Sequence, residues 1–301
     1  MNLETKTLSI ADRNLKKTLC GFLECDVTQP VTFKTVERLA SWSSRYALVA
    51  PILRPFTRFL YENINGRTCR QATFMLSETA VTAVLLWRAT LIALCLNAGR
   101  VALPLKTLVA LDRMEDSVCW QMGFDGAPVG AGFSVFNEQG QLQGWGSYLF
   151  PYSLKHPESD KYDSKYQNAT ELIGAVMLLL WLQRAGGGYR VKITGDSRVV
   201  VQWLLHHRVK SILARRASVA LSILHTSCSH RVESVKHIPA AENQFNDDLS
   251  RGGVNLQHLP QAQRFQSDET THLIAVLNPM LELETEEALL SFMGVVLQIL
   301  R

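Results

Sequence analysis

The sequence has little that would mark a secreted or zinc-binding protein. Its 301 residues include six cysteines, and these show neither CxxC pairing nor the cysteine and histidine spacing of a zinc site. We therefore expect reduced, mostly buried thiols, as in an intracellular protein of the cytoplasm or nucleus. The amino terminus carries Glu4, Lys6 and Asp12 where a signal peptide would need an apolar core, which argues against secretion.

A long uncharged apolar run is also missing. The most apolar stretch, residues 80–97, is preceded by Glu78 and interrupted by Arg88. A helix that crosses a bilayer normally needs about 20 residues of largely uncharged sequence. We therefore expect a buried helix in this region and no membrane partner.

Neither sign of charge dominates. The chain has 31 Lys and Arg against 27 Asp and Glu, a formal net charge of +4. This balance permits nucleic-acid binding without arguing for it. Hydrophobic residues make up 47% of the chain, which excludes a disordered protein and is enough for the cores of two modest domains.

Four acidic residues lie where predicted elements begin or end. Asp125 comes between two apolar runs, near the turn of a predicted hairpin. Glu171 falls in the first turn of a predicted, largely buried helix that glycines close. Asp196 ends a predicted strand of alternating apolar and polar residues, and a helical pattern follows. Asp247 lies in the acidic start of a helix that follows a proline break.

Such a set of carboxylates, brought together, could hold two Mg²⁺ ions, because Mg²⁺ is a hard ion that prefers carboxylate oxygen and water. Two such ions can activate a water and stabilise the leaving oxygen of a phosphodiester. Each acid also has a simpler explanation. Asp125 before glycine is a common turn residue, Glu171 suits the amino end of a helix dipole, and Asp196 and Asp247 are both candidate helix caps.

The residues around these acids resemble the RNase H domain of retroelement reverse transcriptases. FDGAPVGAGFSVF is similar to the first-strand aspartate motif of that family, and NATELIGAV to its helix with the catalytic glutamate. ITGDSRVVVQWL resembles its strand-end Asp-Ser motif, and HIPAAENQFNDDLSR resembles its closing segment. The resemblance implies an α/β fold, an RNase H-like mixed five-stranded sheet with flanking helices.

The resemblance also implies an activity, the hydrolysis of the RNA strand of RNA–DNA hybrids with Mg²⁺, or with Mn²⁺ in its place. Asp125, Glu171, Asp196 and Asp247 would then be the catalytic metal ligands. His237 falls where many cellular RNases H carry a histidine that assists product release or proton transfer. Taken singly, a histidine before Ile-Pro is more often a surface or hydrogen-bonding residue.

Nucleic-acid contacts are expected at six further residues. Two of them adjoin the motifs of the second and third acids. Between residues 208 and 236, six basic residues stand against one acid, and in the family a basic helix or loop in this region grips the hybrid. A solvated helix face would explain the same charges. The residues expected to contact nucleic acid are Arg54, Arg58, Asn168, Ser197, Arg215 and Arg216.

The stretch before the predicted nuclease domain resembles another part of a reverse transcriptase. Residues 32–112 are predicted to be mainly helical and resemble the thumb or connection region of DIRS-like enzymes. Residues 1–31 resemble the exit from a polymerase palm, and no Tyr-x-Asp-Asp motif is found, so we expect a separate polymerase domain or chain as a partner. The RNase H-like domain is predicted over residues 113–252, and a linker and C-terminal helix over residues 253–301.

Three functions stay open at this point, of which the third and weakest is a structural or DNA-repair role adopted by a host. The first is an RNase H-type endoribonuclease derived from a reverse transcriptase that lacks its polymerase palm. The second is a catalytically inactive RNase H-like module that binds nucleic acid or supports a polymerase. The FDGAP segment departs from the more usual Asp-Ala or Asp-Gly-Ser context, which favours the second, whereas the retention of all four acids favours the first.

Overall fold

A computed structural model of the chain shows two compact units, one within Met1–Val109 and the other within Ala110–Glu282. Each unit is described by itself. The structure describes residues 7–8, 12–49, 54–67, 69, 71–96, 103–104, 118–150, 166–185, 190–206, 209, 214, 217–218, 220–221, 224, 231–253, 256–260 and 264–265.

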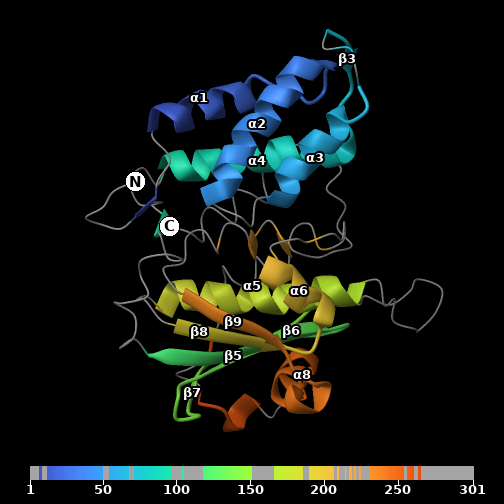
Figure 1. Ribbon diagram of the computed structural model, residues 1–301. Helices are drawn as coiled ribbons and strands as arrows, with labels where there is room; N and C mark the ends of the chain where they lie inside the picture. Colours follow the sequence, from blue (N-terminus) through green and yellow to red (C-terminus); the bar gives the residue numbers. More distant parts are fainter. Residues whose placement is uncertain are drawn as a thin grey trace, which may run out of the picture. The chain divides into compact units, whose positions relative to one another are not determined.

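The first unit is mainly helical, as the sequence predicts. Its core is made by large side chains that are almost fully buried, among them Phe22, Leu39, Phe56, Leu60 and Trp87. Two short antiparallel strand pairs accompany the helices: β1 (Thr7–Leu8) with β4 (Leu103–Pro104), and β2 (Val31–Thr32) with β3 (Thr73–Phe74). The helices are α1 (Asp12–Leu23), α2 (Phe33–Val49), α3 (Arg54–Ile64) and α4 (Glu78–Leu96) (Figure 1).

The charge inside the most apolar helix, α4, has a structural explanation. Arg88 is buried, and its Nε donates to the Phe22 carbonyl oxygen at 2.7 Å, while its Nη2 donates to the Cys25 carbonyl oxygen. Carbonyls at and beyond the end of a helix lack intrahelical partners, so Arg88 satisfies groups that α1 leaves open. Among the described residues, no helix is both long and apolar enough to cross a membrane.

The described cysteines only partly follow the expectation of buried thiols. Cys25 and Cys119 are buried, whereas Cys20 and Cys69 are exposed. All four are free thiols, and the reduced state of the cysteines stays a prediction.

The second unit is built on a mixed five-stranded sheet. The strand order is β7-β6-β5-β8-β9, in which the β7–β6 and β6–β5 pairs are antiparallel and the β5–β8 and β8–β9 pairs are parallel. This confirms the predicted fold class, a mixed five-stranded sheet with flanking helices preceded by a mainly helical region. The strands are β5 (Cys119–Ala127), β6 (Gly130–Phe136), β7 (Leu142–Leu149), β8 (Arg190–Gly195) and β9 (Arg231–His237).

Helices cover both faces of this sheet. Figure 1 shows α5 (Gln167–Ala185) and α6 (Arg198–His206) on one side and α8 (Gln244–Arg251) on the other. Glycine lets α5 approach closely, since a Cβ on Gly126 would lie 2.2 Å from the backbone nitrogen of Glu171, and one on Gly174 would lie 2.6 Å from the Asp125 carbonyl oxygen. The helix and strand that carry two of the four predicted acids are therefore in backbone contact.

The segment after α8 packs on the open edge of the sheet. The Phe265 N–H donates to the Trp145 carbonyl oxygen of β7 at 2.7 Å, and the Trp145 indole N–H donates to the Pro260 carbonyl oxygen at 3.1 Å. The Phe265 ring also lies 5.9 Å from the ring of Phe133. An unpaired edge strand invites pairing with other chains, and this segment pairs with β7 at Trp145. The predicted C-terminal helix lies outside the described residues.

Candidate metal centre

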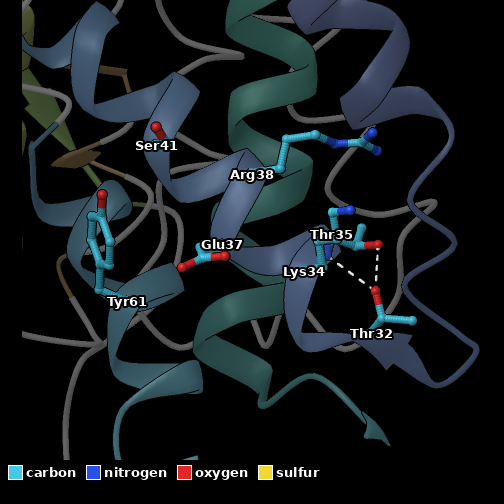
Figure 2. Close-up of a pocket in the computed structure, with 7 residues that line it drawn as sticks. All are labelled: Thr32, Lys34, Thr35, Glu37, Arg38, Ser41 and Tyr61. Carbon is cyan, nitrogen blue, oxygen red and sulfur yellow. Dashed lines mark hydrogen bonds between the residues drawn. The ribbon is translucent and has the colours of Figure 1, made fainter. Parts of the chain in front are cut away.

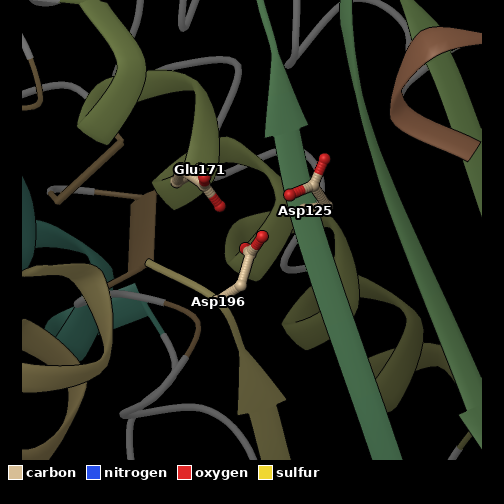
Figure 3. Close-up of side chains that lie close together, drawn as sticks. All are labelled: Asp125, Glu171 and Asp196. Carbon is tan, nitrogen blue, oxygen red and sulfur yellow. The ribbon is translucent and has the colours of Figure 1, made fainter. Parts of the chain in front are cut away.

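Three of the four predicted acids meet at one point of the second unit. Asp125 comes from β5, Glu171 from α5, and Asp196 follows the end of β8. One carboxylate oxygen from each lies within 4.8 Å of the others, and Figure 3 shows the three side chains pointing toward one another. The parallel register pairs Gly123 with Thr194, and the same offset continued by two residues places Asp125 beside Asp196.

The glutamate is held by a neighbour on its own helix. The Gln167 side-chain amide donates to Glu171 Oε1 at 3.0 Å and to the Gly126 carbonyl oxygen at 2.8 Å. Glu171 Oε2 is buried and has no hydrogen-bond partner among the described residues. Because α5 begins at Gln167, Glu171 lies beyond the first turn, and the prediction that placed it in the first turn is wrong. The helix dipole is therefore a weaker explanation for this residue.

The electrostatics of the cluster favour the addition of a cation. Burial raises the pKa of Asp125, the Ser250 hydroxyl opposes that rise, and the charges of Asp196 and Asp247 add to it, which brings the value to about 6. Burial, followed by the charges of Asp125 and Asp196, raises the pKa of Glu171 well above its usual range. Without a cation, like charges and desolvation penalise every ionised state of this cluster.

The residues present fit a divalent metal ion. All three ligand groups are carboxylates, the donor type preferred by hard cations. The unpartnered Glu171 Oε2 is a buried oxygen that a bound cation would satisfy, and buried polar atoms without partners are rare in folded proteins. The cluster of Asp125, Glu171 and Asp196 could therefore bind a divalent metal.

The fourth acid lies outside this group of three. Asp247 is half-buried on α8, and its Oδ1 accepts a hydrogen bond of 2.7 Å from Arg251 Nε, one turn further along the helix. Its charge still reaches the cluster, since it raises the pKa of Asp125. Its predicted role as a metal ligand stays a prediction.

His237 ends β9, where it pairs with Gly195 in the parallel register and is exposed to solvent. His237 therefore lies on the strand beside β8. Its partner in register, Gly195, directly precedes Asp196 in the chain. This location is compatible with the proton-transfer or product-release role that the resemblance implies, and that role stays a prediction.

The two residues predicted by motif adjacency lie together. Ser197 Oγ is 3.4 Å from Asn168 Oδ1, and it accepts a hydrogen bond of 3.3 Å from the Val200 N–H. Ser197 thus takes the position of a helix cap for α6, which was the rival explanation offered for Asp196. Asp196 is therefore not needed to cap α6. Nucleic-acid contact by Ser197 and Asn168 stays a prediction.

The predicted arginine contacts receive less support. Arg54 and Arg58 are exposed on α3, and Arg58 forms an ion pair with Glu62 at 2.5 Å. Arg215 and Arg216 lie outside the described residues. A groove of about 710 Å³ beside α2 is lined by neither Arg54 nor Arg58 (Figure 2). The residues that line it are Thr32, Lys34, Thr35, Glu37, Arg38, Ser41 and Tyr61.

Sequence reasoning missed three buried polar residues, Asn243 at the N-cap of α8 and Asn246 and Ser250 within it. Ser250 Oγ donates to Asp125 Oδ2 at 2.5 Å, and Asn243 Nδ2 donates to Asp196 Oδ1 at 3.3 Å. Asn246 Nδ2 donates to Asn243 Oδ1 at 2.8 Å. Their spacing of three and four residues places them on one helix face, a signal that was present in the sequence.

Comparison with solved structures finds RNase H structures that are similar to part of this chain. No protein-family model matches the chain, and no curated protein matches it. An RNase H1 from the halophilic archaeon Halobacterium salinarum is 20% identical over 44% of this chain and 95% of its own, with a TM-score of 0.35. The N-terminal RNase H domain of a Mycobacterium tuberculosis protein, solved as a fusion with maltose-binding protein, is 16% identical over 45% of this chain and 97% of its own, with a TM-score of 0.34.

A third similar structure is LC11-RNase H1 in complex with an RNA/DNA hybrid. It is 15% identical over 45% of this chain and 95% of its own, with a TM-score of 0.35. The fold assignment of the second unit rests on the order, direction and register of its own strands.

Proposed function

We propose that the chain is an endoribonuclease that hydrolyses the RNA strand of RNA–DNA hybrids at a divalent metal centre. The observation that carries this proposal is the convergence of Asp125, Glu171 and Asp196 within 4.8 Å, from two neighbouring parallel strands and a helix packed on them. The choice of substrate follows from the motifs around these acids, which resemble those of retroelement RNase H domains.

Bound Mg²⁺ or Mn²⁺ would supply an activated water and charge stabilisation of the leaving oxygen. Asp125 and Asp196 would hold the cations from the carboxyl ends of β5 and β8. Glu171 would offer its unpartnered Oε2, while Gln167 fixes its other oxygen. Asp247 would join from the rim once Arg251 releases it. His237, at the exposed end of β9, would take part in proton transfer or product release.

The proposal extends to the origin of the chain. Four motifs in the same order as in retroelement enzymes, together with a preceding helical unit like their thumb or connection region, support descent from a reverse transcriptase of the DIRS-like group. A separate polymerase domain or chain would then be a partner. Nucleic-acid contacts by Asn168, Ser197 and the arginines of the helical unit belong to the same proposal.

A second candidate is an RNase H-like module that grips nucleic acid or supports a polymerase without cutting. The ion pair between Asp247 and Arg251 favours it, because it neutralises the acid that would complete a two-metal site. Both candidates predict hybrid binding, and only the first predicts cleavage.

The test is cleavage of a labelled RNA–DNA hybrid with Mg²⁺ by the full chain and by Asp196→Asn, with duplex RNA and duplex DNA as alternative substrates. Asp248→Asn is the matched control, since Asp248 neighbours Asp247 on α8 and hydrogen-bonds Gln244. Cutting of the hybrid RNA strand that Asp196→Asn abolishes and Asp248→Asn retains would support the endoribonuclease. Hybrid binding without cleavage would identify the binding module.

A further inference from the structure

We propose that a buried polar stripe, made of Asn243 at the N-cap of α8 and of Asn246 and Ser250 within the helix, positions the metal-binding carboxylates of the cluster. The inference rests on the proposed metal centre and assigns it a set of positioning residues. The three side chains follow one another at intervals of three and four residues, so they share the helix face that packs on β5 and β6.

The burial of the stripe is the first observation. The three side chains are 1%, 6% and 0% exposed, in chain order. A buried amide or hydroxyl without a hydrogen-bond partner destabilises a fold. If this face served only to pack α8 on the sheet, apolar side chains would stabilise the fold more. We therefore infer that these polar groups are there for the hydrogen bonds that they form.

The hydrogen bonds of the stripe run toward the acids. Ser134 Oγ on β6 donates to Asn246 Oδ1 at 2.7 Å, and Asn246 Nδ2 donates to Asn243 Oδ1 at 2.8 Å. With its oxygen engaged, Asn243 must present its NH₂ group to the other side, where Nδ2 donates to Asp196 Oδ1 at 3.3 Å and to the Phe124 carbonyl oxygen at 3.1 Å. This chain of hydrogen bonds, from Ser134 through Asn246 and Asn243, therefore sets the orientation of the Asp196 carboxylate.

Ser250 acts on the other aspartate. Its hydroxyl lies 2.5 Å from Asp125 Oδ2 and 2.8 Å from the Asp247 carbonyl oxygen. The hydroxyl has one hydrogen, and an ionised carboxylate is the stronger acceptor of the two. When Asp125 is ionised, Ser250 therefore holds Oδ2 and leaves Oδ1 for a metal ion.

Glycines in β5 and β6 leave room for the polar stripe to lie close to the sheet. A Cβ on Gly132 would lie 2.8 Å from the Ser250 nitrogen, and one on Gly130 would lie 2.5 Å from the Ser250 carbonyl oxygen. A Cβ on Gly123 would lie 2.2 Å from Asn246 Nδ2. Three glycines of the β5–β6 hairpin thus give α8 the close approach that its hydrogen bonds to the acids require.

The test compares Mn²⁺ affinity and hybrid cleavage in the full chain carrying Ser250→Ala or Ser250→Cys. Alanine keeps nearly the volume of serine and removes the hydroxyl, whereas cysteine fills the site with a larger group that is only a weak donor. An effect common to both variants therefore comes from the lost hydroxyl and not from packing. The matched control is Ser147→Ala, because Ser147 Oγ donates to the Leu249 carbonyl oxygen of the same helix at 2.6 Å without contacting an acid.

Groups that orient metal ligands typically change metal affinity by about 10- to 100-fold when removed. We therefore expect titration calorimetry to give a Mn²⁺ Kd at least about tenfold higher for both Ser250 variants, with Ser147→Ala unchanged. Cleavage by the Ser250 variants should recover as Mn²⁺ is raised toward saturation, which a merely structural loss would not produce. If one Ser250 variant fails to fold, the Mn²⁺ affinity of the other variant tests the inference.

Equal Mn²⁺ affinity in the wild type, either folded Ser250 variant and Ser147→Ala would overturn the inference while leaving the endoribonuclease intact. Absence of Mn²⁺ binding by the wild type would overturn both. Mn²⁺ binding by the wild type without cleavage, accompanied by the tenfold loss in the Ser250 variants, would support the positioning role and overturn the nuclease alone.

Discussion

Replacing Asp125 with asparagine should stabilise the metal-free fold at alkaline pH. The pKa of Asp125 rises from an ordinary 3.8 to about 6 in the folded protein. Between these values the folded state binds the proton more tightly than the unfolded state, so the stability of the metal-free protein falls as pH rises through this window. Above it the full penalty is present, roughly 3 kcal/mol for a shift of this size.

The assay is hydrogen exchange of the β5 and β8 amides in EDTA, which reports the opening of the second unit separately from the helical unit. Asp125→Asn should protect these amides more than the wild type at pH 8, and the difference should shrink toward pH 4. Added Mg²⁺ should stabilise the wild type, by about 2.7 kcal/mol at a hundredfold excess over Kd, and stabilise the variant far less. A variant that is less stable than the wild type at pH 8, or a pH-independent difference, would refute the electrostatic account.

Three further predictions concern single residues. Gly174→Ala should push α5 off β5, because the new Cβ would lie 2.6 Å from the Asp125 carbonyl oxygen. Overpacking of this kind lowers the free energy of unfolding by about 1–3 kcal/mol, which chemical denaturation can measure. Gly253→Ala, whose new Cβ would have no atom of a described, non-adjacent residue nearer than 3.7 Å, should leave the free energy of unfolding unchanged. Asp247→Asn should reduce single-turnover hybrid cleavage less than Asp196→Asn, because Asp247 lies outside the cluster of three; an equal loss would make it a full ligand. Arg88→Met should leave the Phe22 and Cys25 carbonyls without this donor and destabilise the helical unit by about 2–4 kcal/mol; hydrogen exchange should show α1 opening while β5 keeps its protection.

The sequence predicts the parts of the site that depend on local pattern. Asp196 follows an alternating strand, and Asp125 precedes a two-residue hairpin turn, so both fall at predictable ends of strands. Once the two strands are parallel neighbours, their register brings the aspartates together. Glu171 was assigned to the correct helix, although the start of that helix was misplaced. Asn168 and Thr170 are residues that favour the N-cap position, but both lie inside the first turn of α5.

The contacts that orient the acids could not be read from local pattern. Ser250 and Asp125 are 125 residues apart in the chain, so their hydrogen bond exists only after α8 docks on the hairpin. The same holds for Asn243 and Asp196, 47 residues apart. A buried polar stripe at helical spacing hinted that α8 has polar partners, but its partners depend on which strands the helix meets.

The roles of exposed residues were harder to predict from the sequence than the contacts of the buried ones. Arg54 and Arg58 were selected because they lie in the segment that resembles a thumb or connection region and because guanidinium groups match the geometry and charge of phosphate. The structure gives Arg58 a partner one turn away on its own helix. An exposed side chain is restrained by few neighbours, and surface ion pairs contribute little to stability. Sequence position therefore says little about which exposed arginines would face a nucleic acid.

The most direct test of the central claim measures metal occupancy and hybrid cleavage on the same samples across a Mg²⁺ titration, with wild type and Asp196→Asn side by side. If Asp125, Glu171 and Asp196 form the catalytic metal centre, occupancy and cleavage of the RNA strand should rise together in the wild type, and both should be lost in the variant. Cleavage that persists in Asp196→Asn, or metal binding by the wild type with no cutting of the hybrid, would contradict the account.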